Sequence, residues 1–309
     1  MQFTIFQESR IGRRKSNQDR VAYCYSRDAL LMLVADGMGG HLHGEIAAHL
    51  AVQSIAGAFQ SEAHPALQDP AQFLPQALLA AHGEIVDYSL IKDMDETPRT
   101  TIVAGVVQDG YLYWAHAGDS RLYLLRQGEV IAQTRDHSRV QLMMDQGLLD
   151  AESAARHPGR NRVYSCLGGN RSPHIELSDR IRLRDGDVVL LCTDGLWGPL
   201  GTEDIAAALT AGNLMDIIPS LMTRAEALSG VVCDNLSIVA MRWNLKEDTG
   251  PDSISTHEMT PDGFTSHMSL SQPAAQPDNE DKDEGEFTED DIERAIEELN
   301  AAIRKFKQP

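Results

Sequence analysis

The sequence of 309 residues contains few cysteines, and their spacing is not that of a metal-binding or disulfide-stabilised domain. Cys24, Cys166, Cys192 and Cys233 lie far apart in the chain, with no CxxC motif. This spacing argues against a structural zinc site and against a disulfide framework. A reducing compartment, the cytoplasm, is therefore the expected location.

Long apolar runs and an excess of basic residues are also missing. No stretch reaches the roughly 18 apolar residues that a membrane helix needs, and the N-terminal segment MQFTIFQESR does not resemble a secretory signal. The chain has 27 Lys and Arg against 46 Asp and Glu, which gives a formal net charge of −19. Because phosphate backbones bind to basic surfaces, we expect no nucleic-acid partner and no membrane span.

More than half of the excess negative charge lies after residue 244. Residues 245–309 contain 17 acidic and 6 basic side chains, a net charge of −11. Residues 245–287 are rich in Asp, Glu, Ser, Thr, Pro and Gly and have few large apolar side chains, which is typical of disorder. The sequence therefore predicts a folded domain over 1–244, a disordered acidic linker over 245–287 and a separate terminal segment over 288–309.

The terminal segment regains a helical pattern. Five large apolar residues recur at steps of 4, 3, 4 and 3, on one face of an amphipathic helix: Ile292, Ile296, Leu299, Ile303 and Phe306. An isolated helix of this length is marginally stable in water. We therefore expect it either to dock on a partner that the sequence does not identify or to fold back on the folded domain, and a solvated, frayed tail is the alternative.

Residues 1–244 mix strand and helix patterns without the regular alternation of a parallel α/β fold. Apolar runs predict strands near 2–6, 29–35, 101–107, 111–116, 121–125, 187–192 and 236–242. Helical spacing predicts helices over 45–59, 73–90, 203–210 and 214–228, and Pro75 suits the first turn of the second helix. This order favours a layered α+β domain.

Lone aspartates stand at the ends of several apolar runs. LMLVADGMGG ends a strand at Asp36, LLCTDGLW ends another at Asp194, Asp234 begins DNLSIVAMRW, and Asp119 lies in the turn AGDSR. Each Asp-Gly pair alone is also an ordinary turn signal. Converging carboxylates, however, repel one another unless cations lie among them, and oxygen ligands of this kind suit Mg²⁺ or Mn²⁺.

Six segments, in order, resemble the motifs of metal-dependent serine/threonine protein phosphatases of the 2C type (PPM family), in their bacterial form. They are GRRKSNQD, VADGMGGHLHGEIAA, RTTIVAGVV, AHAGDSRLYLLRQGEV, LLCTDGLWGPL and CDNLSIVAMRW. The resemblance implies a four-layer α/β/β/α sandwich, with two mainly antiparallel sheets flanked by helices. It also implies hydrolysis of phosphoserine and phosphothreonine in proteins by a metal-activated water, in opposition to a bacterial serine/threonine kinase.

The same resemblance assigns a metal centre that binds two or three Mn²⁺ or Mg²⁺ ions. It implies that Asp36 bridges two ions and that the Gly37 carbonyl binds one of them, which would explain the bare backbone after Asp36. Asp194 and Asp234 would bind the other ion.

Three more residues receive roles from the resemblance. Asp19 would hold a metal-bound water or bind a metal directly, Asp119 would bind a weaker third ion, and Arg14 would hold the phosphate. Gln18 stands where the family has Glu, which removes one charge from the second metal site. His116 replaces the usual Asn of the turn motif, and we expect it to have a packing role.

Residues 137–175 lie where the family carries its most variable insertion, so we expect a mobile flap beside the site. The start, DHSRVQLMMDQGLL, has a helical pattern. The rest is loop-like and basic, and four arginines are candidates for docking a phosphoprotein: Arg156, Arg160, Arg162 and Arg171.

Two other functions remain open at this point. The chain could be a catalytically weak phosphatase fold that acts as a docking or regulatory module through its C-terminal helix. A cysteine phosphatase is disfavoured, because CLGGNR, from Cys166 to Arg171, is one residue shorter than a CxxxxxR loop. The retained Asp36, Asp194 and Asp234 favour an active metal-dependent enzyme.

Overall fold

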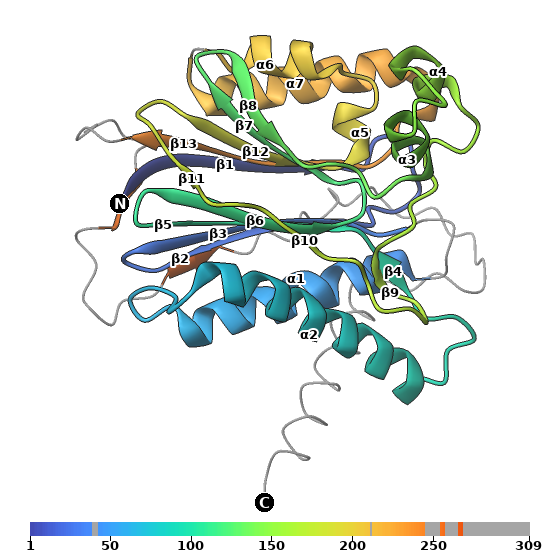
Figure 1. Cartoon of the computed structure of the whole chain (residues 1–309), viewed down its shortest axis with the longest axis horizontal. Helices are drawn as coiled ribbons and strands as arrows, with labels where there is room; N and C mark the ends of the chain where they lie inside the picture. Colours follow the sequence, from blue (N-terminus) through green and yellow to red (C-terminus); the bar gives the residue numbers. More distant parts are fainter. Residues whose placement is uncertain (39–42, 211, 245–253, 257–264, 268–309) are drawn as a thin grey trace, which may run out of the picture. The chain divides into compact units, whose positions relative to one another are not determined.

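The computed structural model describes residues 1–38, 43–210, 212–244, 254–256 and 265–267. These residues form two antiparallel β-sheets that stack face to face, with helices against both outer faces (Figure 1). The α+β class predicted from the sequence is confirmed. No helix within the described ranges is both long and apolar enough to cross a bilayer.

The first sheet contains strands from both ends of the domain. Its order is β14-β1-β13-β12-β7-β8, and every neighbouring pair is antiparallel. The strands span β1 (Gln2–Arg10), β7 (Arg121–Arg126), β8 (Glu129–Gln133), β12 (Val188–Cys192), β13 (Leu236–Asn244) and β14 (Ile254–Ser255).

The second sheet has the order β10-β6-β5-β3-β2-β15, and β11 also pairs with β6. Its strands span β2 (Asp19–Tyr25), β3 (Ala29–Asp36), β5 (Ile102–Gln108), β6 (Tyr111–Ala117), β10 (Glu176–Leu177), β11 (Ile181–Arg182) and β15 (Thr265–His267). Two further short strands, β4 (Arg99–Thr100) and β9 (Leu167–Gly168), pair with each other, and Thr100 of β4 also forms an antiparallel bridge with Gly37.

Each sheet is covered by one pair of helices. On the second sheet lie α1 (Gly44–Glu62) and α2 (Pro70–Ile91), and on the first lie α6 (Thr202–Ala208) and α7 (Leu214–Ser229) (Figure 1). Short helical turns lie at one end of the sandwich: α3 (Arg139–Asp145), α4 (Ala151–Arg156) and α5 (Asp194–Trp197). The 3₁₀ turn η1 (Gly230–Val232) follows α7.

The central strands are buried on both faces, and this explains their continuous apolar runs. In β12, Val189 and Leu191 belong to the buried cluster between the sheets, whereas Leu190 belongs to the cluster under α6 and α7. A strand with two buried faces has no polar side to alternate with, so its sequence reads as an unbroken apolar run. The predicted strands and the four longer helices are confirmed with small shifts of their ends.

Several local predictions need correction. Pro75 is not in the first turn of α2, because the helix begins at Pro70 and the Asp69 carboxylate accepts hydrogen bonds from its first N–H groups. The sequence analysis also missed β2 and β8. Strand β2 mixes polar and apolar residues, and β8 is a short edge strand whose residues alternate between exposed and half-buried.

Two short segments within the predicted linker form strands. Residues 254–255 pair with β1, and residues 265–267 pair with β2. The buried Thr256 explains why the first of these is held, since its hydroxyl lies 2.6 Å from the Arg27 carbonyl and 2.8 Å from the N-terminal amine of Met1. The other residues of 245–287 and the amphipathic helix predicted over 288–309 lie outside the described residues.

Candidate metal centre and active-site cleft

Two aspartates meet where the second sheet ends. Asp19 begins β2, Asp36 ends β3, and the two residues are register partners. Asp19 is 2% exposed, and its Oδ2 accepts a hydrogen bond of 2.9 Å from the Thr193 hydroxyl. Among the described residues its Oδ1 has no hydrogen-bond partner. Because Thr193 immediately precedes Asp194, this bond brings the end of β12 to the same place.

Close backbone packing requires glycine at two positions of this centre. A Cβ on Gly37 would lie 2.5 Å from the Gly44 carbonyl oxygen and 2.6 Å from that of Gln18. A Cβ on Gly195 would lie 2.0 Å from the Asn235 carbonyl oxygen. The bare backbone after Asp36 and Asp194 therefore lets neighbouring chain segments approach, a reason that the sequence analysis did not give.

Asp234 and Arg14 form an ion pair at the rim. The Arg14 Nη2 atom lies 2.6 Å from Asp234 Oδ2, and the hydrogen bond to Asp234 raises the pKa of Arg14. Asn235 holds the segment that carries Arg14, since its amide donates to the carbonyls of Ile11 and Ser16 at 2.9 and 3.0 Å. This asparagine lies in the motif CDNLSIVAMRW, but its positioning role was not evident from the sequence.

Asp119 reaches the same centre from the turn between β6 and β7. Its backbone carbonyl accepts a hydrogen bond of 2.9 Å from the indole of Trp197, the last residue of α5, which begins at Asp194. Arg121 lies 3.6 Å above the Trp197 ring and makes two 2.8 Å hydrogen bonds to the Asp136 carboxylate. The turn is therefore fixed by residues from three separate parts of the chain.

The carboxylates raise one another's pKa values. Burial raises the pKa of Asp19 to about 7, with the charges of Asp194 and Asp234 adding to the effect. Burial and then Asp234 raise the pKa of Asp194 to about 6. The pKa of Asp36 is raised well above its ordinary value by burial first and by Asp19 next, and that of Asp119 is raised by burial and then by Asp194.

Divalent cations fit this set of donors. Five carboxylates converge, one buried carboxylate oxygen lacks a hydrogen-bond partner among the described residues, and burial and mutual repulsion oppose ionisation without cations. Carboxylate oxygens are the ligands that Mg²⁺ and Mn²⁺ prefer. The donor set is therefore suited to the metal ions expected from the sequence.

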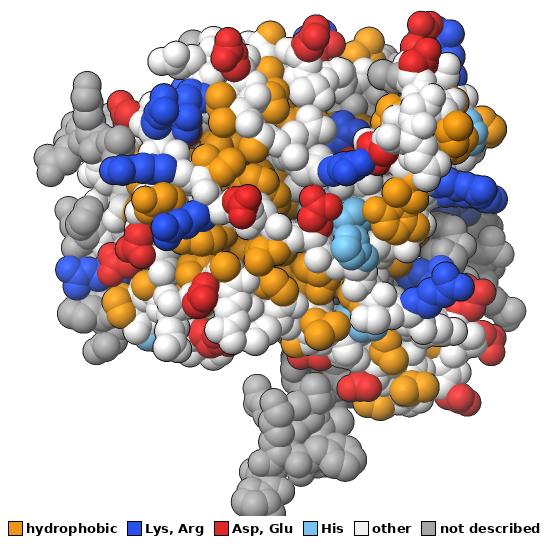
Figure 2. Space-filling model, viewed as in Figure 1, with side chains coloured by type: hydrophobic (Ala, Val, Ile, Leu, Met, Phe, Trp, Pro, Cys, Tyr) orange, Lys and Arg blue, Asp and Glu red, His pale blue; other side chains and the backbone are white. Residues whose placement is uncertain are grey.

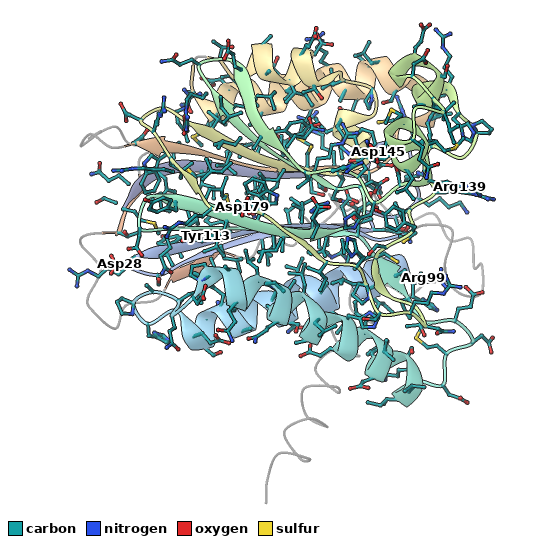
Figure 3. All side chains as sticks on the ribbon, viewed as in Figure 1. Asp28, Arg99, Tyr113, Arg139, Asp145 and Asp179 are labelled. Carbon is teal, nitrogen blue, oxygen red and sulfur yellow. The ribbon has the colours of Figure 1, made fainter. Side chains whose placement is uncertain are left out.

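The centre opens into a cleft of about 1040 Å³ with two walls. The strand-end wall contains Arg14, Asp36, Asp119, Asp194 and Asp234. The flap wall contains residues 161–166 and 168–173, and Met38, Arg99 and Thr101 complete the lining. Figure 3 places Arg99 at this end of the sandwich and Asp28 at the opposite end.

The four candidate docking arginines are divided by the structure. Arg162 and Arg171 line the cleft. Arg156 and Arg160 are exposed but are not part of the cleft lining, and Arg156 forms an exposed ion pair of 3.0 Å with Glu152. A docking role for all four arginines together therefore gains no support from their placement.

Cys166 lies in the lining of the cleft, which the sequence analysis did not anticipate. All four cysteines are described and all are free. Burial is the main cause that raises the pKa of Cys166, so this side chain is a neutral thiol near pH 7 and a poor nucleophile. The position of Cys166 in the cleft therefore does not support a cysteine phosphatase mechanism.

Gln18, which stands where the family has Glu, lies next to another acidic residue. Its side-chain amide donates a 2.9 Å hydrogen bond to Glu45 in the first turn of α1. A carboxylate therefore remains next to this position, although on another element. His116 has the packing role that we expected, because it is buried and its ring stacks on His137 at a centroid distance of 4.4 Å.

Comparisons with known proteins agree on one family. Residues 6–228 match the model of the family described as protein phosphatase 2C. The chain is 34% identical over 227 residues to the serine/threonine protein phosphatase PstP of Mycobacterium tuberculosis. The aligned region covers 73% of this chain and 42% of that protein. The chain therefore spans about two fifths of the length of that relative.

Two further proteins resemble the chain over most of their own length. The serine/threonine phosphatase stp of Listeria innocua is 28% identical over 238 residues, covering 76% of this chain and 93% of that protein. A crystal structure of the catalytic domain of the serine/threonine protein phosphatase PstP in complex with two manganese ions is 30% identical. It has a TM-score of 0.63 and covers 78% of this chain and 98% of the other.

Proposed function

The chain belongs to the protein phosphatase 2C family of metal-dependent serine/threonine protein phosphatases, and from this membership we propose that it hydrolyses phosphoserine and phosphothreonine in proteins. The observation that carries the proposal is the convergence of Asp19, Asp36, Asp194 and Asp234 beside Arg14. A phosphatase of this kind needs cations and a phosphate-binding group in one place, and this end of the sandwich supplies both.

Asp36, Asp194 and Asp234 would hold two divalent cations, and Asp119 would hold a third. Bound cations would lower the pKa of a water molecule and offset the negative charge of the phosphate. Asp19 is suited to orient a water or to bind a cation, because Thr193 fixes one of its oxygens and leaves the other available. The relative crystallised with two manganese ions supports Mn²⁺, and Mg²⁺ is the alternative.

Arg14 would bind the phosphate. Its side chain is 54% exposed and its guanidinium presents several donors at the mouth of the cleft. A phosphate could accept two parallel hydrogen bonds from it, and the Asp234 carboxylate, now paired with Arg14, would then be available to a cation. The exposed Arg162 and Arg171 on the flap wall would contact the protein around the phosphorylated residue.

Phosphoproteins follow as substrates from this activity, and a serine/threonine kinase of the same cell would supply them. The unidentified partner of the C-terminal helix and the cytoplasmic location remain proposals from the sequence. The second candidate function, a catalytically weak docking module, gains no observation in its favour, since the carboxylates and Arg14 meet in one cleft.

The test compares hydrolysis of a phosphothreonine peptide and of a small aryl phosphate with and without Mn²⁺. We expect hydrolysis of both with Mn²⁺, loss on chelation and recovery on adding Mn²⁺ back. Arg14→Ala should weaken both reactions, whereas Arg13→Ala, a neighbouring cation outside the cleft lining, should not. Absence of hydrolysis by a folded, Mn²⁺-loaded protein would favour the docking module instead.

A further inference from the structure

A second group of potential metal ligands lies outside the aspartate centre. His116, His137 and Glu176 each place one ligand atom within 4.8 Å of the others. His116 is in β6, His137 follows β8, and Glu176 begins β10, where it is the register partner of His116. A patch of histidine side chains is visible on the face shown in Figure 2, near the position of β10 in Figure 1.

The hydrogen bonding of His116 leaves one nitrogen available. Its Nε2 lies 2.8 Å from the Arg135 carbonyl, and a carbonyl can only accept, so Nε2 carries the proton. The lone pair of the neutral ring is then on Nδ1, which is buried and has no hydrogen-bond partner among the described residues. A backbone carbonyl that fixes the tautomer of a histidine is the usual support of a metal-binding imidazole.

His137 and Glu176 face each other at a separation suited to a small cation. Their Nε2 and Oε2 atoms are 3.4 Å apart. Two ligands at about 2.0–2.1 Å from a tetrahedral Zn²⁺ ion are roughly 3.3–3.4 Å apart. The three ligand atoms lie within 4.8 Å of one another, but the His116 and His137 rings stack with centroids 4.4 Å apart, so at least one ring must turn for both to bind one ion. Glu176 is 46% exposed, so an ion could enter from solvent.

Both histidines are neutral near pH 7. Burial lowers the pKa of His116, and burial followed by the neighbouring His116 lowers the pKa of His137 to about 4. The cluster therefore offers lone pairs and not imidazolium groups. Two imidazoles and one carboxylate suit Zn²⁺, in contrast to the all-oxygen aspartate centre, which suits Mg²⁺ or Mn²⁺.

We propose that His116, His137 and Glu176 form a Zn²⁺ site, separate from the aspartate centre, with water as a fourth ligand. His137 and Glu176 stand at the two ends of the flap segment, so an ion bound between them would hold these ends together and against β6. Binding at His137 Nε2 also moves the ring proton to Nδ1, which now accepts a weak 3.4 Å hydrogen bond from the Gly118 N–H. Occupancy would therefore oppose that contact beside Asp119.

The test uses Co²⁺ as a spectroscopic substitute for Zn²⁺, with the full-length protein in excess Mg²⁺ to occupy the carboxylate centre. We expect one equivalent of Co²⁺ to produce the visible absorption of a tetrahedral site and Zn²⁺ to abolish it by competition. His116→Asn and Glu176→Gln should each weaken Co²⁺ binding by at least about tenfold. His157→Asn and Glu152→Gln, which alter a histidine and an exposed glutamate outside the cluster, should leave the absorption unchanged.

Two results would overturn the proposal. The first is the absence of a saturable Co²⁺ band in the unmodified protein. The second is an unchanged band in Glu176→Gln, a variant of a half-exposed side chain that should not disturb folding. Thermal unfolding of His116→Asn shows whether that variant folds, and if it does not, the Glu176 variant alone decides the assignment.

Discussion

The two walls of the cleft differ in how they are built. The strand-end wall has three aspartates next to the ends of β3, β12 and β13, namely Asp36, Asp194 and Asp234, together with Arg14 and the buried Asp119 of the β6–β7 turn. The flap wall is an irregular segment whose Arg162, Tyr164 and Arg171 are exposed. Under the proposed function, the strand-end wall would support the chemistry and the exposed flap wall would contact the substrate protein.

Asp36→Asn should produce the largest effect, because it alters the centre of the strand-end wall. We expect hydrolysis of peptide and aryl phosphates to fall at least about tenfold, a loss of ~1.4 kcal/mol or more in transition-state stabilisation. The metal-free variant should unfold at a temperature no lower than the unmodified protein, since one mutually repelling carboxylate is gone. Retention of more than about a tenth of the rate would exclude a bridging role for Asp36.

The strand-end wall could largely be predicted from the sequence, whereas for the flap wall only its place beside the site and two of its residues, Arg162 and Arg171, were expected. Asp36 and Asp194 follow apolar strands directly, so a local pattern marks them. Residues of the flap wall are placed by long-range contacts, such as the pairing of Arg99 with Gly168 and of Ser138 with Val163. A local sequence pattern cannot predict such long-range pairings. For this reason Arg99 and Cys166 were not expected in the cleft.

Metal removal should make the stability of the strand-end wall depend on pH. The pKa of Asp19 is raised to about 7 and that of Asp194 to about 6, mainly by burial. The folded, metal-free state therefore holds protons that the unfolded state releases, and its stability should fall as pH rises from about 4 to 7. Melting temperatures in chelator should be higher at pH 5 than at pH 8.

The control for this pH dependence is the same series in excess Mg²⁺. Bound cations favour the ionised carboxylates, so the decline towards pH 8 should be reduced or reversed. A metal-free protein whose melting temperature rises steadily from pH 5 to pH 8 would contradict the raised pKa values of this cluster.

Asp119→Ala should have an intermediate effect, since Asp119 enters from a turn and not from a strand end. We expect turnover of a phosphopeptide to fall by less than about tenfold, with the other aspartates still able to hold two ions. Titration with Mn²⁺ provides the measurement: one weak binding event should disappear and the tighter ones should remain. Unchanged kinetics and unchanged stoichiometry would remove Asp119 from the set of ligands.

Charge reversal on the flap wall should affect substrate binding and not chemistry. For Arg162→Glu/Arg171→Glu we expect KM for a phosphoprotein to rise about fivefold, in line with roughly 1 kcal/mol for exposed charges. Hydrolysis of a small aryl phosphate should be unchanged. The matched control is Arg156→Glu/Arg160→Glu, which alters two arginines outside the cleft lining. Equal losses on both substrates would refute the division between the walls.

The smallest effect on hydrolysis should come from truncating the C-terminal region. Removal of residues 268–309 deletes the predicted amphipathic helix but keeps the buried Thr256, and removal of residues 245–309 deletes both. Thr256 joins the carbonyls of Met1 and Arg27 at the end of the sandwich that also carries Asp28, far from the cleft, so aryl phosphate hydrolysis should be unchanged in both proteins (Figure 3).

The two truncated proteins should differ in stability and share a loss of partner binding. Losing the Thr256 hydrogen bonds leaves buried polar groups unsatisfied, at a cost of about 1–3 kcal/mol. The shorter protein should therefore melt roughly 2–8 °C lower than the longer one. Pull-down and sedimentation test the helix: both truncations should lose a partner, or a self-associated species, that the full chain retains. Identical bound proteins and identical sedimentation for all three chains would show that residues 288–309 are not an interaction element.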